Sequence, residues 1–525
     1  MNFSFPSFWQ QMRTTGVGVG LLLMLAACQP EKFLTPPRAA TETAVAATAV
    51  AALTPPVSTA TPIPTLTPAA EIVTTAATNP TITIWINESS ATHAALMAEI
   101  AGNFSQTHPI HVEVVHVTPK LLPQFLNTAV LSDTVPDLIL HPIDYTIGWY
   151  EDGILDGAAA QAVLDQLGAE TFDQEALSLL RDPQNAGIVA ALPSDGWKQL
   201  LIYRADWYVE RNLPPPLDYT SIISNAEAIY NPEALISGLV VPTESDLLST
   251  QQVFEQFAVA NGCQLIDDKG EVIITQPACE QAFDFYRRLI NRFSPSDVQT
   301  DTSARNAYLE GRTGLIMSSP SLLPVLAGLD PNVQPTCAEC ATSDYLARNS
   351  GFVTSLRGNN PQAAASSYSQ ITALGITTSA HTAAAQTFAA YWFEEAYLAW
   401  LSLEPERKVP LRLGTAANPT QFSDAWLTLP VAGSDKTLLD FYPADLVDDL
   451  RQGIAQAARW GFRQGQGALI SHMAAEQVMP ILLQEMLSGY FTSAQTVQEA
   501  YKRTVALIPD YAYHPTPTPT PTATP

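Results

Sequence analysis

Strand and helix patterns alternate between Ile82 and Leu140, and this order constrains the fold more than any other feature of the chain. Apolar and β-branched residues alternate in Ile82–Ile86 and again in His111–Val117, and a short apolar run, Pro136–Leu140, follows. The segments between them, Thr92–Gln106 and Leu121–Leu131, carry apolar residues on one helical face. This order predicts an α/β fold with a parallel sheet covered by helices.

Polar residues follow the first and third of these predicted strands. Asn87, Glu88 and Ser89 come directly after the first strand, and the segment His141–Asp144 follows the third. Ligands of parallel α/β sheets bind beyond the carboxyl ends of the strands. These two segments are therefore candidate ligand-binding positions.

The rest of the chain alternates less regularly. We expect a strand at Leu200–Tyr203, a helix at Gln281–Arg292 and a strand at Gly314–Met317. Loops are expected over Leu326–Ser369, one long helix over Ala383–Leu403 and mostly helix over Ala444–Leu507.

The net charge excludes one class of partner. The 525 residues include 51 acidic and 25 basic side chains, which give a formal charge of −26. A chain this acidic repels a phosphate backbone, so we expect no nucleic-acid partner. Hydrophobic residues make up 46% of the sequence, enough for a chain of this length to build more than one folded core.

The N-terminal sequence is typical of a targeting segment. An apolar run of twelve residues, Gly16–Ala27, follows Arg13. The run is shorter than the roughly 20 residues that span a bilayer, so residues 1–27 are predicted to be a signal peptide. Leu25-Ala26-Ala27-Cys28 resembles a bacterial lipobox, which predicts lipid on Cys28 and an extracytoplasmic protein anchored to the cell membrane. The alternative is a generic secretion signal with a chance cysteine.

Low-complexity segments lie at both ends of the expected globular part. Residues 28–80 are rich in Thr, Pro and Ala, and residues 514–525 repeat Pro and Thr. Such compositions bury too little apolar surface to offset the entropy of ordering. We predict a disordered tether at 28–80 and a disordered tail at 514–525.

Short motifs spread over more than 400 residues resemble the extracellular solute-binding proteins of ABC importers, of the maltose-binding type. They occur in this order: Ile84–Asn87, Pro136–Asp137, Gly153–Leu155, Pro193, Leu201–Tyr203, Leu213–Pro215, Tyr219–Thr220, Asn261–Gly262, Asp268–Gly270, Tyr308–Gly314, Gly375–Ile376 and Pro410–Arg412. The resemblance covers nearly all of residues 81–507.

The resemblance implies a periplasmic-binding-protein-like fold of two α/β lobes with a ligand cleft between them, which closes by hinge motion. It places the first lobe at 81–194 and 375–412, and the second at 195–374 and 413–513. Chain crossings are implied near Asp195–Trp197, at Ile371–Leu374 and after Arg412.

The same resemblance implies the binding residues. It supports Asn87 and Glu88 as ligand-binding residues, and it places Asp144 where the family has a cleft aspartate. His141 and Ser321 stand where maltose-binding members have tryptophans, and Trp197 stands where they have a glutamate. These three differences argue against maltodextrin specificity and leave a carbohydrate-binding role. A charged acceptor or an aromatic face suits sugar hydroxyls and ring C–H groups.

The function implied is capture of a carbohydrate and its delivery to an ABC permease, without catalysis, cofactor or metal. The sequence has no phosphate-binding loop, zinc helix or nucleophile elbow. On a strand, His111 and His116 face opposite sides, which argues against a histidine metal site. The alternatives are a receptor for another solute such as a polyol or compatible solute, a surface glycoside hydrolase, and an adhesion or sensory lipoprotein.

Four cysteines remain after Cys28, an even number that favours disulfides in an oxidising compartment and allows three pairings. The resemblance implies a hairpin after Asn261–Gly262, which would bring Cys263 to Cys279. Cys337 and Cys340 have the spacing of a redox motif without a thioredoxin-like context, so a local disulfide is expected.

Overall fold

The computed structural model describes residues 79–88, 90–378, 381–452 and 458–509. They belong to one compact unit that begins at Ala76. The predicted signal peptide, Cys28, the tether up to residue 78 and the tail at 514–525 lie outside the described residues. Within the described ranges, no helix is long and apolar enough to cross a membrane.

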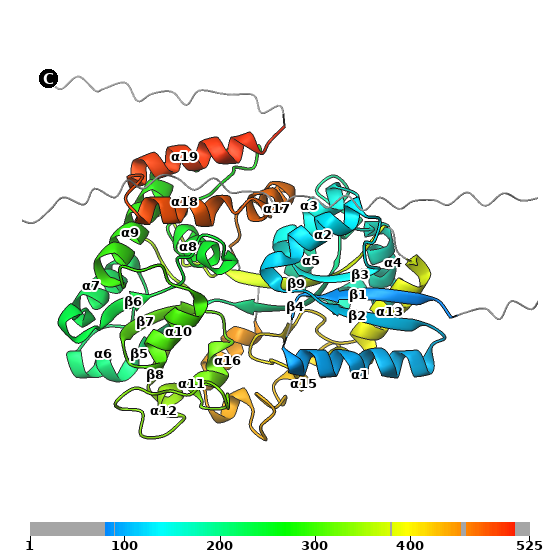
Figure 1. Cartoon of the computed structure of the whole chain (residues 1–525), viewed down its shortest axis with the longest axis horizontal. Helices are drawn as coiled ribbons and strands as arrows, with labels where there is room; N and C mark the ends of the chain where they lie inside the picture. Colours follow the sequence, from blue (N-terminus) through cyan, green and yellow to red (C-terminus); the bar gives the residue numbers. More distant parts are fainter. Residues whose placement is uncertain (1–78, 89, 379–380, 453–457, 510–525) are drawn as a thin grey trace, which may run out of the picture. The chain divides into compact units, whose positions relative to one another are not determined.

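The first sheet contains the predicted parallel strands. β1 (Thr81–Ile86) lies between β2 (His111–His116) and β3 (Leu138–Pro142) and runs parallel to both. α1 (Ala91–Thr107) and α2 (Leu122–Leu131) connect them, so this part of the prediction is confirmed (Figure 1).

Burial explains why this sequence forms these elements. Ile82, Ile84 and Ile86 alternate along β1 and are each 0% exposed, since every second side chain of a strand points to the same face. Met97 and Phe104 of α1 pack into the same core. The Ser90 side chain accepts a hydrogen bond from the His93 amide and caps the start of α1.

Antiparallel strands complete this sheet and lead to the second one. β9 (Ser369–Ile376) pairs with β3 and β4 (Leu192–Lys198), and β10 (Val409–Pro410) pairs with β4, so the order is β10-β4-β9-β3-β1-β2. β4 ends at Lys198, and β5 (Leu200–Arg204) begins the second sheet after one residue, Gln199. The chain therefore passes between the sheets at this residue.

The second sheet has the order β6-β7-β5-β8, with β6 at Ser237–Val240, β7 at Thr313–Ser318 and β8 at Ser350–Val353. The helices grouped with it in Figure 1 are α6 (Ala205–Arg211), α7 (Tyr219–Ile229), α8 (Leu248–Ala260), α9 (Pro277–Phe293), α10 (Asp301–Leu309), α11 (Leu322–Leu326) and α12 (Tyr345–Asn349).

The remaining helices come between β3 and β4 or after β9 in the sequence. They are α3 (Thr146–Glu151), α4 (Gly157–Leu167), α5 (Gln174–Leu180), α13 (Thr382–Glu394), α14 (Tyr397–Leu401), α15 (Gln421–Trp426), α16 (Ala444–Arg451), α17 (Gly467–Ala475), α18 (Val478–Leu487) and α19 (Ser493–Ala506). α17 packs against α3 (Figure 1), although the sequence division assigns it to the second lobe. The lobe boundaries stay predictions.

Two local expectations are wrong. The long helix expected over Ala383–Leu403 is two helices, α13 and α14, with a turn at Glu395. After this turn, the Tyr397 hydroxyl accepts hydrogen bonds from the amides of Leu411 and Arg412. The sequence has no glycine or proline at the turn that would indicate it. The region expected to be loops, Leu326–Ser369, contains α12 and β8, which were too short to show a periodic pattern.

The four cysteines form two disulfides. Cys263 is joined to Cys279, and Cys337 to Cys340. The first closes the turn around Asp267–Gly270, where Ile266 and Val272 pair in antiparallel fashion, onto the start of α9. These are the two pairings expected from the sequence.

Candidate functional site

A cavity of about 560 Å³ is lined by residues that follow strands of both sheets. From the first sheet come Asn87 after β1 and Tyr145 after β3, and from the second come Ser319 and Ser321 after β7. Gln199, where the chain crosses between the sheets, also lines it. The cavity thus lies at the carboxyl ends of strands, where α/β folds bind ligands.

Four of the six predicted binding residues line the cavity: Asn87, Glu88, Trp197 and Ser321. Trp197 is opposite Gln370 in the β4–β9 pairing, and Gln370 lines the cavity too. Trp197 and Tyr145 bring aromatic side chains to the wall, each 7% exposed. Aromatic side chains combine a large apolar face with a polar edge, which suits a ligand having both kinds of surface.

Several oxygen atoms of the lining residues lack a protein donor. Asn87 Oδ1, Gln199 Oε1, Gln251 Oε1 and Asp246 Oδ1 are buried without a hydrogen-bond partner among the described residues. A buried acceptor left unpaired costs about 1–3 kcal/mol, so native proteins keep few of them. The four oxygens are closed off from the cavity in this structure, so a ligand that donates hydrogen bonds would pair with them after their side chains turn toward it. Three of the four belong to amides that carry no charge.

An ion-pair cluster forms another part of the wall. Glu88 contacts Arg407 and lies 3.5 Å from Lys408, and Glu404 lies 2.9 Å from Arg407. Burial alone would raise the pKa of Glu88, but Arg407 and Lys408 lower it below its ordinary value. The pKa of Glu404 is lowered too, by Arg407 and His93 against its own burial. Both carboxylates are therefore held in the ionised form.

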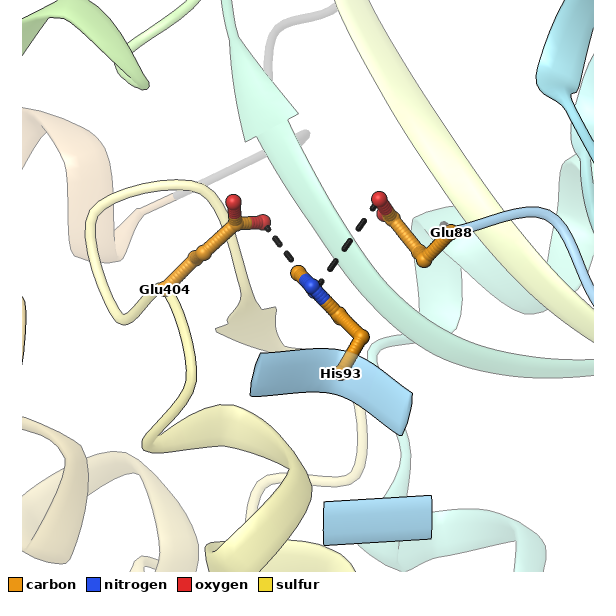
Figure 2. Close-up of side chains that lie close together, drawn as sticks. All are labelled: Glu88, His93 and Glu404. Carbon is orange, nitrogen blue, oxygen red and sulfur yellow. Dashed lines mark ion pairs between the residues drawn. The ribbon is translucent and has the colours of Figure 1, made fainter. Parts of the chain in front are cut away.

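His93 points its Nε2 atom between these two carboxylates (Figure 2). The atom lies 3.9 Å from Glu88 and 3.6 Å from Glu404, and the three potential metal-ligating atoms fall within 4.8 Å of one another. Arg407 and Lys408 already balance both negative charges, so a divalent cation would add uncompensated positive charge to a largely buried place. We read the cluster as an ion-pair network. The part of the chain that the structure describes has no other such group of three.

His141 and Asp144, the other two predicted binding residues, are placed differently from the prediction. Both are 0% exposed, and neither lines the cavity. The His141 ring lies 3.1 Å from both the Ile139 carbonyl and the Thr146 hydroxyl, and burial lowers its pKa to about 4. Pro142 and Tyr145 from the same strand end line the cavity, whereas the side chains of His141 and Asp144 turn into the protein.

Asp144 belongs to a buried network around Arg459. The Arg459 guanidinium donates to Asp144 at 2.5 Å and to Glu255 of α8 at 3.1 Å. Asp144 follows β3 of the first sheet, whereas α8 belongs with the second. Arg459 thus joins elements of the two sheets, and both the Arg459 and Glu255 side chains are almost wholly buried.

The same network fixes an amide in the cavity wall. Gln370 donates to Asp144 at 2.6 Å and accepts from Arg459 at 3.3 Å. Its orientation is therefore set by the ion pair. Burial would lower the pKa of Arg459, but Asp144 is the main group that raises it, so the guanidinium stays charged. Burial raises the pKa of Glu255 despite Arg459.

Sequence reasoning missed several of the wall residues: Gln199, Asp246, Gln251, Gln370 and Arg407. Gln199 is two residues from Trp197, and a crossing placed there could have suggested it. Gln251 and Glu255 lie on α8, where nearly every residue is buried, so an amphipathic pattern gives no indication of their role.

A surface ion pair spans the cavity lining. Lys120 donates to Asp246 at 2.8 Å; Lys120 precedes α2, beside the first sheet, and Asp246 precedes α8. The hydrogen bond and charge of Asp246 raise the pKa of Lys120. Both side chains are about half exposed, so the pair contributes little to stability by itself.

Comparison with known proteins identifies the fold. No protein-family model matches the chain. Over 334 residues, 62% of this chain and 72% of the relative, it is 23% identical to a putative ABC transporter periplasmic-binding protein, YcjN, of Escherichia coli K12. An ABC transporter solute-binding protein of Thermotoga lettingae with bound α-D-tagatose superposes with a TM-score of 0.63 at 18% identity, covering 82% of this chain and 99% of that one.

Two further solved structures are similar. T. maritima MalE3 with maltose gives a TM-score of 0.62 at 16% identity, over 82% of this chain and all of that one. A sugar transporter protein of Arthrobacter chlorophenolicus with laminaribiose gives 0.63 at 12% identity, over 82% and 99%. The chain has the two-lobed fold of ABC-transporter solute-binding proteins. The predicted fold class is confirmed.

The Arg459 network yields a stability prediction. Arg459→Met leaves two buried carboxylates without their cation, which should lower the free energy of unfolding by about 3–5 kcal/mol. The triple variant D144N/E255Q/R459M removes the charges together and should recover a large part of that loss. Urea denaturation measures both.

A matched control is Arg463→Met. Arg463 forms an ion pair with Glu175 and is 49% exposed, so its loss should cost under about 1 kcal/mol. Equal losses for Arg459→Met and Arg463→Met would contradict the role given to the network.

Proposed function

We propose that this chain is an extracytoplasmic receptor that captures a neutral carbohydrate in the cleft and delivers it to an ABC permease. The observation that carries the proposal is that four residues of the cavity lining, Asn87, Gln199, Gln251 and Asp246, each hold a buried acceptor without a partner in the described part of the chain. A polyhydroxylated ligand offers a donor for each, while its ring C–H groups can lie against Trp197 or Tyr145. The relatives support it, because their names describe sugar-binding and periplasmic-binding proteins.

The charges of the wall favour a neutral ligand. Glu88 is already paired with Arg407, and Lys120 with Asp246. The described lining also includes Arg305, Asp301 and Asp330, so positive charge is not in excess. An anionic ligand such as a sugar phosphate or a uronate would lose its hydration and meet four lining carboxylates against three cations.

The rival solutes differ in hydrogen-bond donors. A compatible solute of the quaternary-ammonium type has none, so it would leave the amide oxygens unpaired. A site built to pair a hydroxyl rejects an analogue that lacks it, by as much as about 10⁴–10⁵-fold. A polyol satisfies the acceptors but lacks a rigid ring face for Trp197, which makes it the closer alternative. A ribitol-bound solute-binding protein of Agrobacterium radiobacter shares the fold at a TM-score of 0.58.

The cavity wall gives less support to a glycoside hydrolase. Such enzymes need a protonated carboxyl and a free carboxylate on either side of the scissile bond. Burial raises the pKa of Asp301, which accepts a hydrogen bond from Ser249. Glu88 is ionised, but Arg407 and Lys408 bind its carboxylate and reduce its nucleophilicity. The relatives are solute-binding proteins, which are non-enzymatic transport components.

The ligand assignment is tested by a thermal-shift screen of the purified chain. A ligand at 100 times its Kd adds about 2.7 kcal/mol to folding stability, so a neutral mono- or oligosaccharide should raise the Tm most. Matched uronates and glycine betaine should raise it little. In calorimetry with the best sugar, Trp197→Ala and Gln251→Ala should each weaken binding by about 1–3 kcal/mol, roughly 5- to 150-fold.

Gln124→Ala is the control, because Gln124 is an exposed residue of α2 outside the cavity lining. Its affinity should equal that of the unmodified protein. Unchanged affinity in both Trp197→Ala and Gln251→Ala, or a larger Tm shift with the uronates or betaine, would refute the proposed site. Conversion of the oligosaccharide into shorter products would favour the hydrolase instead.

The proposed anchoring rests on Leu25-Ala26-Ala27-Cys28, with residues 28–80 as a tether between the lipid and the cleft. Cys28→Ala removes the lipid acceptor and should move the protein from the membrane to the soluble fraction in cell fractionation. The unmodified protein is the reference. A Cys28→Ala protein that stays with the membrane would contradict lipid anchoring while leaving the ligand proposal intact.

A further inference from the structure

The two disulfides lie in different surroundings. Cys263 and Cys279 are both 0% exposed and belong to the large core around α8 and α9. Cys337 and Cys340 lie in the irregular segment between α11 and α12, where Cys337 is 5% exposed and Cys340 is half-buried. A reductant can therefore approach Cys340 while the first disulfide stays enclosed in packed side chains.

A buried guanidinium lies beside Cys337. Arg204, at the end of β5, is 0% exposed and donates to Asp206 at 2.9 and 2.6 Å. Its Nη1 atom has no hydrogen-bond acceptor anywhere in the described part of the chain. A Cβ placed on Gly311 would lie 3.5 Å from this Nη1 and 3.0 Å from Cys337 Cβ, so the Nη1 atom lies no more than 6.5 Å from Cys337 Cβ.

The surroundings of Arg204 suit a thiolate at Cys337. A cation and a hydrogen-bond donor lower the pKa of a thiol, and a low-pKa thiol leaves faster in disulfide exchange. Glu339, between the two cysteines, lies 3.4 Å from Arg204 and is 44% exposed. Its carboxylate competes for the same guanidinium and opposes negative charge on the sulfur.

We propose that Cys337–Cys340 is a thiol–disulfide exchange site, opened selectively by a dithiol reductant while Cys263–Cys279 stays intact. A thiolate of the reductant attacks Sγ of Cys340, the S–S bond breaks, and its electron pair goes to Sγ of Cys337, beside the Arg204 N–H. In the mixed disulfide, the first sulfur of the reductant is bonded to Sγ of Cys340. The second thiol of the reductant attacks that first sulfur and releases Cys340 as a thiolate. The protein pair gains two electrons and two protons, and the dithiol becomes a disulfide.

Opening this bond would affect the border of the cavity. Cys337 and Cys340 are 3 positions apart in the sequence, whereas Cys263 and Cys279 are 16 positions apart. The Cys337–Cys340 disulfide therefore closes a shorter loop and restrains the unfolded chain less. The segment 327–344 that contains it follows α11, and its Asp330 lines the cavity. Ser321, Leu322 and Val325, at and just before α11, line the cavity as well. Reduction is thus expected to loosen one edge of the cleft without unfolding the core.

The test titrates the full chain with dithiothreitol, traps free thiols by alkylation and quantifies each cysteine by peptide mass spectrometry. Cys337 and Cys340 should be trapped together at reductant concentrations at least tenfold below those that open Cys263–Cys279, which serves as the internal control. Hydrogen exchange of the selectively reduced protein should rise in residues 327–344 and stay unchanged in α8 and α9. Simultaneous opening of both disulfides, or earlier opening of Cys263–Cys279, would overturn the proposal.

Glu339→Gln tests the part assigned to Arg204 without disturbing a buried side chain. Removing the competing carboxylate should speed reduction of Cys337–Cys340 severalfold. Glu310→Gln is the matched control, because Glu310 is a similarly exposed acid paired with Arg312 and not with Arg204. Equal rates in Glu339→Gln and the unmodified chain would contradict the role of Arg204. These measurements need no ligand, so their outcome is independent of the proposed transport function.

Discussion

The arrangement of the cavity depends on the buried ion pairs that the Arg459 guanidinium forms with Asp144 and Glu255. The guanidinium binds Asp144, which follows a strand of the first sheet, and Glu255, on a helix beside the second. Charges this deeply buried are tolerated only when each is paired and hydrogen-bonded, so the three residues must be placed together. Through them Gln370 is held in the cavity wall, opposite Trp197. A single ion-pair network thus connects an element after the first sheet to a helix beside the second and positions Gln370 in the cavity wall.

Local patterns in the sequence were sufficient to predict the first half of the first sheet. Alternation in β1 and β2 and the amphipathic faces of α1 and α2 are set by residues near one another in the chain, so they could be seen without the fold. The break between α13 and α14 could not be predicted, because distant contacts of Tyr397 accompany it. The two lobes came from the resemblance, since no local pattern shows which strands will share a sheet.

The candidate site was predictable only in part, for a related reason. Strand ends indicated Asn87 and Glu88, and the resemblance added Trp197 and Ser321; all four line the cavity. The same rule selected His141 and Asp144, yet whether a side chain at a strand end faces a cleft or the interior depends on what packs above it. For Asp144 that is Arg459, which is 315 positions away in the sequence. Gln199 and Gln251 were missed because unpaired polar atoms become visible only once burial is known.

The amide acceptors without a partner on the residues that line the cavity are proposed to bind the hydroxyl groups of a neutral sugar. A crystal structure of the protein with the sugar that gives the largest Tm shift tests this most directly. It should show ligand hydroxyl oxygens at hydrogen-bond distance, about 2.7–2.8 Å, from Asn87 Oδ1, Gln199 Oε1 and Gln251 Oε1, with a ring face against Trp197 or Tyr145. A sugar bound elsewhere, or one in the cleft that leaves these three oxygens unpaired, would contradict it.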